Sequence, residues 1–388
     1  MNPRHPHAPG TLARAPWLRT LPLLGAVFAC AAATGQVREP NSPAHTAQSP
    51  SPHARHLQSP QFAADENVFR NPPNPHARPS QGTLRIWARF ILQSKQSTVP
   101  ADPIPVQPLT RAQLDALPDD ANHLVRLGHS SHLLKLQGKY WLIDPVFGER
   151  ASPFGFVGPK RFHTPPLKLE DLPPIEGLLL SHDHYDHLDR PTIEYLRDRV
   201  KRYFVPLRVA ARLQDMGVAA ERIAEFDWWD SAEHAGVKLT ATPAYHFSGR
   251  APWDNNSTLW ASWVIEAGGQ RLYFSGDSAY FDGFAEIGRR FGGFDIALVE
   301  NGAYDDAWPS VHMAPEETIR ATKDLRAKVL HPVHNSTFDL AFHPWQEPME
   351  RIAALAVENN VELATPVIGE VLTIGQPRSN QLWWRGLK

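Results

Sequence analysis

Apolar residues recur at two spacings along this chain from about residue 83 onward, and together they predict one α/β domain over residues 83–388. Runs that alternate apolar and polar positions, or that are continuously apolar over a few residues, favour strands. They are His123–Phe147, which turns at Gln137-Gly138 as a β-hairpin would, Ile175–Leu180, Val237–Phe247, Leu259–Asp277, Phe294–Glu300 and Lys328–His334. Apolar residues at helical spacing, or a helix-start signal, mark Thr83–Gln93, Arg190–Val200 and Pro315–Leu325. Strands therefore carry the middle of the domain and helices punctuate it, as in layered α/β folds.

The N-terminal segment, residues 1–35, has the pattern of a secretory signal. Arg4, Arg14 and Arg19 precede the uncharged run Thr20–Thr34, which is too short to span a bilayer comfortably but long enough for a signal-peptide core. Cys30 stands in "VFAC", a loose match to the box at which bacterial lipoproteins are lipidated. The sequence favours an exported protein, periplasmic or membrane-anchored, and leaves open both lipidation at Cys30 and a merely uncleaved apolar terminus.

Residues 36–82 are rich in Pro, Ser, His and Asn and show no apolar periodicity. Such a segment buries too little apolar surface to offset the entropy of ordering it. We therefore expect a disordered tether between the N-terminal signal and the domain.

Composition narrows the chemistry. A formal net charge of -2 gives no general attraction to nucleic acid, so a nucleic-acid partner is not expected. The single cysteine, Cys30, excludes an internal disulfide and any cysteine-based metal site. A dense metal site in this chain would have to consist of histidine and carboxylate.

The stretch Ser181–Asp189, "SHDHYDHLD", supplies both kinds of side chain directly after the apolar run Ile175–Leu180. Residues i and i+2 of an extended segment point the same way, so His182 and His184 can hold one ion together. Asp186 and His187 follow a short turn later and can hold a second ion. Zinc and similar cations favour imidazole nitrogen and carboxylate oxygen. The alternative, a solvated polar loop, leaves this concentration of charge uncompensated.

This H-x-H-x-D-H stretch resembles the first metal motif of the metallo-β-lactamase superfamily. Further segments resemble the branch that contains N-acyl-phosphatidylethanolamine-hydrolysing phospholipase D and its bacterial relatives. They are "LGHSSHLLKLQGKYWLIDPVF", "HFSGR", "LWASWVI", "FSGDSAYFDGFAEIGRRFGGFDIALVENGAY", "HMAPEE" and "HNSTF", and the similarity covers roughly residues 120–345. The resemblance implies an αββα sandwich with a dinuclear metal site at the edges of two β-sheets.

The resemblance also implies a role for each matching residue. One zinc would be held by His182, His184 and His246, and the other by Asp186, His187 and His334, with Asp277 bridging them. Iron or manganese in place of zinc stays open. A hydroxide between the two metals would attack the substrate, because the metals lower the pKa of a bound water. His331 is an alternative to His334, although "HNSTF" fits the branch better.

Several other residues have both a functional and a structural interpretation. His312 matches a family histidine near the leaving group, where it would donate a proton or contact phosphate. Arg250 would pair with an anionic phosphate or form a structural salt bridge. Asp144 and Asp183 are expected to support the ligands from behind, although Asp183 equally fits a solvent-facing position. His129 and His132 are expected in the core or at the rim, and His163 is expected to be structural.

The resemblance implies a zinc-dependent hydrolase acting on a phosphodiester of a lipid or other small molecule. A lactonase or other carboxylic-ester hydrolase is the leading alternative, since the same hydroxide can open an ester. A non-catalytic zinc-binding envelope protein is a further alternative, but it would be expected to lack a ligand, and none is missing. Peripheral or lipid-anchored membrane association fits such a substrate, and the sequence leaves the oligomeric state open.

Overall fold

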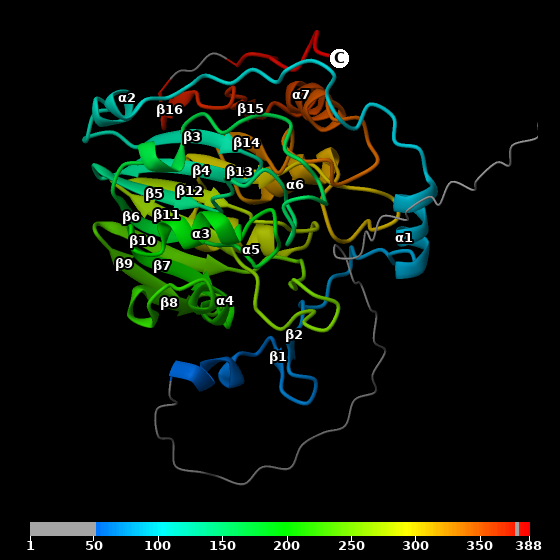
Figure 1. The fold of residues 1–388 in the computed structure, drawn as a ribbon, viewed down its shortest axis with the longest axis horizontal. Coiled ribbons are helices and arrows are strands. Elements are labelled where there is room, and N and C mark those ends of the chain that lie inside the picture. The colour runs from blue at the N-terminus through cyan, green and yellow to red at the C-terminus, as the bar shows by residue number, and fades with distance from the viewer. Residues whose placement is uncertain (1–51, 377–379) are drawn as a thin grey trace, which may run out of the picture.

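Two seven-stranded β-sheets lie face to face in the computed structural model, which describes residues 52–376 and 380–388 (Figure 1). The first sheet runs in the order β16-β3-β4-β5-β6-β7-β8. Its strands are β3 (His123–Gly128), β4 (Ser131–Leu136), β5 (Lys139–Ile143), β6 (Ile175–Leu179), β7 (Val200–Pro206), β8 (Ile223–Phe226) and β16 (Val371–Thr373). The second sheet runs in the order β15-β14-β13-β12-β11-β10-β9. Its strands are β9 (Ser231–His234), β10 (Val237–Thr242), β11 (Ser262–Ala267), β12 (Gln270–Phe274), β13 (Ile296–Glu300), β14 (Val329–Val333) and β15 (Glu362–Leu363).

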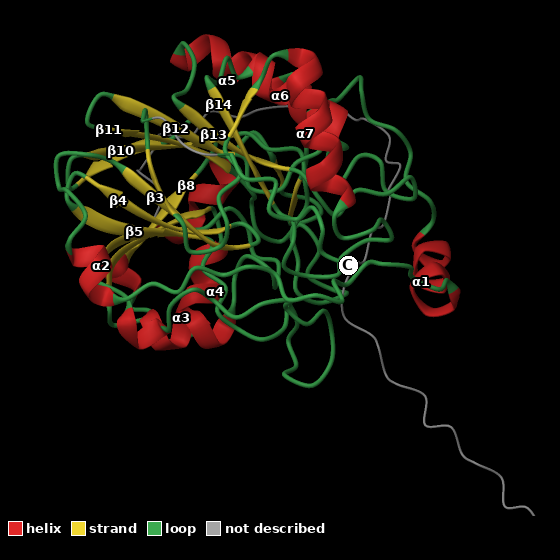
Figure 2. Ribbon diagram, turned by 90° about the horizontal axis from the view of Figure 1, so that it is seen from above, coloured by secondary structure: helices red, strands yellow, loops and turns green. Residues whose placement is uncertain are grey.

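Helices cover the outer face of each sheet, as Figure 2 shows. The first sheet is covered by α2 (Arg111–Asp115), α3 (Arg190–Leu196) and α4 (Val209–Asp215). The second is covered by α5 (Gly283–Phe291), α6 (Pro315–Asp324) and α7 (Glu347–Asn359). A further helix, α1 (Thr83–Leu92), lies apart from both layers. The short 3-10 turns are η1 (Pro52–Gln58), η2 (Leu169–Asp171) and η3 (Ala220–Arg222).

Alternation along the strands produces these layers. In β11, Trp263 and Ile265 belong to the apolar cluster between the two sheets, whereas Val264 between them belongs to the cluster under α5–α7. Successive strand side chains point to opposite faces, so one strand can serve two cores. The expected αββα sandwich is confirmed by this arrangement.

The predicted elements match the structure with shifted ends. Val237–Phe247 ends as a strand at Thr242, because Pro243 has no N–H to donate to a ladder. The predicted helix Arg190–Val200 ends at Leu196, and β7 begins at Val200. The predicted hairpin turn at Gln137-Gly138 joins β4 to β5. A second turn, at His129-Ser130, joins β3 to β4.

Residues 52–82 differ from the disordered tether that their composition predicts. They contain η1 and a two-stranded ladder of β1 (Phe62–Ala63) and β2 (Val68–Phe69), and they run along the domain surface. Phe69 is fully buried, and its backbone N–H donates to Asn256 O at 2.8 Å. Contacts with distant backbone, rather than a core of its own, order this segment. Residues 1–51, with the predicted signal and Cys30, lie outside the described residues.

None of the helices within the described part of the chain combines the length and the apolar character needed to cross a bilayer.

Candidate metal centre

The carboxyl ends of strands from both sheets meet at one edge of the sandwich. β5 to β8 are mutually parallel in one sheet, and β12 to β14 in the other, so their ends point to the same side. The loop Ser181–Asp189 follows β6, Asp277 follows β12 and His334 follows β14. His246 lies on the irregular segment after β10. Segments far apart in sequence thereby bring their polar side chains together.

The loop Ser181–Asp189 is fixed at both ends. Asp144, just after β5, accepts hydrogen bonds from Ser181 N at 2.7 Å and from Ser181 Oγ at 2.5 Å. At the other end, the Asp189 carboxylate accepts from Thr192 N at 3.2 Å and caps α3, which has Pro191 in its first turn. The intervening imidazoles and carboxylate of the loop therefore have little freedom to turn away.

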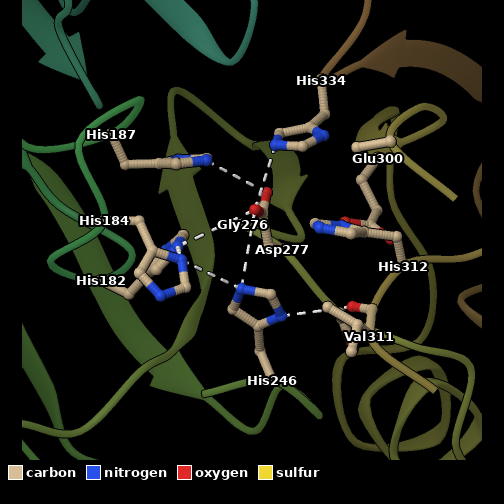
Figure 3. A network of polar contacts seen from close by, with 12 residues as sticks. His182, His184, His187, His246, Gly276, Asp277, Glu300, Val311, His312 and His334 are labelled. Carbon is tan, nitrogen blue, oxygen red and sulfur yellow. Dashed lines mark hydrogen bonds and ion pairs between the residues drawn. The ribbon is translucent and has the colours of Figure 1, made fainter. Parts of the chain in front are cut away.

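Four of the predicted ligands form a first cluster, here called group one: His182, His184, His246 and Asp277 (Figure 3). His184 Nδ1 lies 2.8 Å from His182 Nε2 and 3.3 Å from His246 Nε2. Asp277 Oδ2 lies 3.8 Å from His182 Nε2 and 3.7 Å from His246 Nε2. Three ring nitrogens and one carboxylate oxygen thus converge on one point.

A second cluster, here called group two, consists of His129, Asp186, His187 and His334. Asp186 Oδ2 lies 3.2 Å from His334 Nε2 and 3.5 Å from His187 Nε2. His129 Nε2 donates to the same oxygen at 2.9 Å. His129, expected in the core or at the rim, is buried and contacts the predicted ligand Asp186 directly.

Asp277 joins the two groups. Its Oδ1 faces His187 Nε2 at 3.2 Å, and its Oδ2 faces His334 Nε2 at 3.1 Å. Gly276 before it has φ +55°, and a Cβ at that position would stand 2.7 Å from Ser181 Cβ. Only glycine fits this turn, which directs the Asp277 carboxylate to the middle of the centre.

The histidines of the two groups differ in the direction in which their pKa values are shifted. Burial lowers the pKa of His182 and His246 well below the ordinary range, so these rings are neutral. Burial works against ionisation at His334 too, but the Asp277 and Asp186 carboxylates outweigh it and raise the pKa of His334 to about 10. Burial likewise opposes ionisation of Asp277, yet His187 and His334 hold the pKa of its carboxyl well below the usual range.

The donor set fits divalent cations. Four donors about 2 Å from one tetrahedral cation lie roughly 3.3 Å apart, close to the separations in both groups. His187 Nε2 and Asp277 Oδ1 are buried and face each other, and neither makes a hydrogen bond within the described structure. Buried polar atoms without partners are rare and costly. A cation between such atoms satisfies them, and nitrogen–oxygen donor sets of this kind suit zinc, iron and manganese.

Asp144 lies behind the ligands, as predicted, and holds His187. Its Oδ2 accepts from His187 Nδ1 at 2.7 Å, which leaves His187 Nε2 facing the centre. Asp183 is buried as well, but it touches no ligand ring: it accepts from Gly249 N at 2.8 Å and pairs with Arg212 Nε at 3.2 Å. Its carboxylate fixes the segment after His246 to the motif loop.

Arg250 is the predicted substrate residue that the structure corrects. Its Nη1 donates to Asp183 O at 2.6 Å and to Leu188 O at 2.8 Å, and its guanidinium lies 3.9 Å from the centre of the Tyr185 ring. These contacts tie the motif loop to the segment after His246. They make Arg250 a structural cation, the alternative that the sequence had left open.

His312 lies beside Asp277 and is joined to a residue that the sequence analysis did not single out (Figure 3). Its Nδ1 donates to Glu300 Oε2 at 3.0 Å, while Met313 N donates to Glu300 Oε1 at 2.6 Å. Asp277, Glu300, His312 and His334 also form a third cluster of converging ligand atoms. Glu300 is the last residue of the apolar strand β13, and a carboxylate at the end of such a strand was the only feature of the sequence that could have indicated its place at the site.

His331, the alternative last ligand, lies outside the centre. Its Nδ1 donates to Ala364 O at 2.8 Å and its Nε2 faces His132 Nε2 at 3.0 Å. His331 is on β14, whereas His334 is just past the strand end with φ +62°, a left-handed conformation that turns it toward Asp186. The geometry therefore brings His334, and not His331, to the other candidate ligands.

Known proteins resemble this chain in sequence and in fold. A family model described as beta-lactamase superfamily domain matches residues 140–335. An uncharacterised protein of Mycobacterium tuberculosis is 41% identical over 308 residues, 78% of this chain and 81% of the relative. N-acyl-phosphatidylethanolamine-hydrolyzing phospholipase D 1 of Caenorhabditis elegans is 32% identical over 311 residues, 74% of this chain and 86% of the relative. The solved isothiocyanate hydrolase from Delia radicum gut bacteria matches with a TM-score of 0.52 and 21% identity, covering 64% of this chain and 98% of that one.

Proposed function

This chain belongs to the metallo-β-lactamase superfamily, in the branch of N-acyl-phosphatidylethanolamine-hydrolysing phospholipase D, and is a metal-dependent hydrolase; on that premise we propose that it cleaves a phosphodiester of an N-acylated phospholipid or a related lipid with two zinc ions. The observation that carries the proposal is the convergence of a complete set of imidazole and carboxylate donors on both sides of Asp277. A structural zinc site has four protein ligands and no further neighbour, whereas two adjoining sites that share a carboxylate favour catalysis.

In this proposal His182, His184 and His246 hold one cation, Asp186, His187 and His334 hold the other, and Asp277 contacts both. When bound, the two cations supply a water molecule acidified to near-neutral pKa and positive charge opposite the oxygens of the transition state. Burial favours the cation of group one, because His182 and His246 are neutral before it arrives and can bind it without losing a proton. In group two, His334, whose pKa is about 10, has to release its proton when a cation binds.

His312 is proposed to serve the leaving group. A carboxylate accepts but does not donate, so the contact with Glu300 Oε2 keeps a proton on His312 Nδ1 and leaves Nε2 to exchange a proton with the substrate. The ring stacks beside His334, with centroids 4.9 Å apart, and lies 5.3 Å from the ring of His246. The free Nε2 can take up the proton that the attacking water releases and pass it to the alkoxide as it departs.

The loops around the centre support a lipid substrate. The loop after His246 carries Trp253, which is 86% exposed, and the loop after β5 carries Phe156, which is 82% exposed. Aromatic side chains of this kind favour the interface between water and lipid. Together with the basic, then apolar, start of the chain, they favour an exported protein that works at a membrane surface. Sedimentation with phospholipid vesicles should be weaker for a Phe156→Ser/Trp253→Ser variant; equal sedimentation would argue against membrane association.

The test is a side-by-side assay of the full chain. N-acyl-phosphatidylethanolamine, a chromogenic phosphodiester and a lactone are each supplied with and without a chelator, and bound metal is measured by elemental analysis. We expect phosphodiester cleavage, about two zinc ions per chain, and loss of both on chelation. Lactone opening without phosphodiester cleavage would replace the proposed substrate class, and a single tightly held ion would contradict the paired site.

A further inference from the structure

A segment from the N-terminal side of the domain runs over the loops that deliver three functional side chains. This segment, Ser59–Gly82, is here called the strap. Phe69 N donates to Asn256 O at 2.8 Å in the loop after His246. Asn74 Nδ2 donates to Tyr280 O at 2.9 Å in the loop after Asp277, and Gln81 N donates to Ala307 O at 2.7 Å in the loop before His312.

Asn71 in the strap holds the backbone of His246. Its Nδ2 donates to His246 O at 2.6 Å, and its Oδ1 accepts from His246 N at 3.1 Å. The same Oδ1 accepts from Trp260 Nε1 at 3.1 Å, which fixes the amide in place. His246 is buried and stands beyond the end of β10, where no neighbouring strand pairs with its N–H and C=O. The Asn71 amide thus replaces a strand neighbour for a residue that would otherwise bury two unpaired backbone groups.

The ring of His246 has a second support that also depends on the N-terminal side. His246 Nδ1 donates to Val311 O at 3.2 Å, so that Nε2 faces His184 and Asp277. The strap holds the loop that contains Val311: Arg78 N donates to Ser310 Oγ at 2.6 Å, and Ser310 Oγ donates to Arg78 O at 2.9 Å. Behind it, Ile86 of α1 packs in one apolar cluster with Val311.

We propose that the strap is a constituent part of the metal centre, and that Asn71 is a positioning residue that sets the place of His246 as a ligand. The proposal rests on the proposed function, because it takes His246 to hold a cation of group one. His182 and His184 come from a loop that Asp144 and Asp189 fix within the domain. Asp183 and Arg250 hold the segment after His246, and Ser278 Oγ accepts from Tyr245 N at 2.9 Å before it. Among the described residues, however, Asn71 alone is hydrogen-bonded to the backbone N–H and C=O of His246 itself, so the strap sets the place of this ligand in group one.

The consequence is specific to one cation. Contacts that orient a ligand typically change metal affinity about 10- to 100-fold when they are removed. Asn71→Ala should therefore lower the affinity for one of the two zinc ions by this factor and leave the affinity for the other unchanged. Asn74→Ala is the matched control: like Asn71→Ala it removes a side-chain donor to a backbone carbonyl, Tyr280 O, and an acceptor for a backbone N–H, that of His76, from the same strap, but neither partner is a candidate ligand.

The experiment compares four full-length proteins: wild type, Asn71→Ala, Asn71→Asp and Asn74→Ala. Zinc affinity and stoichiometry are measured by competition with a chromophoric chelator. The visible spectrum of the cobalt-loaded forms and the melting temperature are measured as well. Asn71→Asp keeps an acceptor for His246 N–H but sets a carboxylate oxygen against His246 O, where the amide had donated, so its zinc affinity should fall at least as far as that of Asn71→Ala. The cobalt spectrum should change in both Asn71 variants and not in Asn74→Ala.

Two zinc ions held by Asn71→Ala as tightly as by wild type, or equal weakening in Asn74→Ala, would overturn the positioning role. A general loss of folding would lower the melting temperature and both affinities together, and would overturn it as well. If the wild-type protein bound no zinc, or only zinc that Asp277→Asn also retains, the proposed function would fail, and this inference with it. The zinc titration of the wild type therefore distinguishes failure of the proposed function from failure of the positioning role of Asn71 alone.

Discussion

Two buried polar regions lie side by side in this protein, and both are rich in histidine. One is the metal centre of groups one and two. The other, here called the polar layer, lies behind it between β3, β4 and β14, and its side chains are Arg126, His132, His163, His331, Asn335 and Thr337. The two regions adjoin at Thr337, whose Oγ1 accepts from His129 N at 2.7 Å and faces His163 Nε2 at 3.1 Å.

In the polar layer the ring nitrogens of the histidines are engaged in hydrogen bonds with other groups of the protein. His132 Nδ1 donates to Ser130 O at 3.0 Å, and His163 Nδ1 donates to Thr164 O at 2.8 Å. Within the described residues, neither His132 nor His163 makes a hydrogen bond or ion pair with a carboxylate. Burial lowers the pKa of His132 and of His163 to about 3, so they stay neutral.

In the metal centre the same residue type meets carboxylates that point inward. His334 is as buried as His132, yet Asp277 and Asp186 raise its pKa to about 10. The contrast shows what distinguishes a cation site from buried histidine in general. It is the convergence of ring nitrogens on shared carboxylate oxygens, with the other ring nitrogen held from behind, and not the number of histidines.

The largest expected effect comes from the residue that joins both groups. Asp277→Asn replaces one carboxylate oxygen by an amide nitrogen that cannot bind a cation, so one cation loses a ligand, the other keeps only a neutral carbonyl oxygen, and the centre loses a negative charge. We expect turnover to fall by at least about 1,000-fold, the scale of losing a main electrostatic stabiliser, with little change in far-ultraviolet circular dichroism. Initial rates on a chromogenic phosphodiester measure it, and wild-type rates in this variant would exclude Asp277 from the centre.

The next prediction compares the two regions through two histidines at the end of β14. His334→Ala should release one zinc ion and lower turnover by about 100-fold or more, since even outer contacts of a metal cost up to that factor. His331→Ala, three positions away, should keep both ions and near-wild-type turnover while lowering the free energy of unfolding by about 1–3 kcal/mol, because it leaves buried polar atoms unpaired. Elemental analysis and urea unfolding of the pair decide between them. Metal loss in His331→Ala would erase the distinction between the regions.

Most of the centre could be predicted from the sequence because its ligands follow strand ends. The H-x-H-x-D-H stretch after β6 is marked by its own residues, whereas Asp277 after β12 and His334 after β14 were assigned because they match later motifs of the family that the chain resembles. The sandwich itself followed from the resemblance and from alternating apolar runs, although β7, α4, α5 and α7 were not predicted individually.

The residues that sequence reasoning missed act through distant contacts. Asn71 lies in a segment whose composition predicts disorder, and it is ordered by hydrogen bonds to the backbone of a residue 175 positions away. Glu300 looks like the end of an apolar strand, and only the fold brings it to His312. Arg250 was expected to pair with a phosphate or to form a salt bridge, whereas its partners are carbonyl oxygens, which no residue pattern marks.

Glu300 tests the boundary of the metal centre, since it is a buried carboxylate that can belong to the third cluster of ligand atoms or serve only His312. Glu300→Gln keeps the shape and an acceptor for His312 Nδ1 but removes the negative charge. We expect kcat to fall about 10- to 100-fold through the leaving-group proton, with KM and zinc content unchanged. Loss of a zinc ion in this variant would instead make Glu300 a ligand and extend the centre.

The smallest effect concerns stability in acid and comes from the polar layer. Because His163 stays neutral in the folded protein down to about pH 3, whereas an exposed histidine binds a proton near pH 6.5, the unfolded chain holds one more proton between these values. Its contribution is therefore complete above pH 6.5 and is lost as pH falls toward 3, by up to about 1.4 kcal/mol per pH unit. His163→Gln removes this contribution. Urea unfolding of metal-free wild type and variant at pH 7 and pH 5.5 should show a weaker pH dependence in the variant, and identical dependence would mean that the His163 ring takes up a proton inside the folded domain.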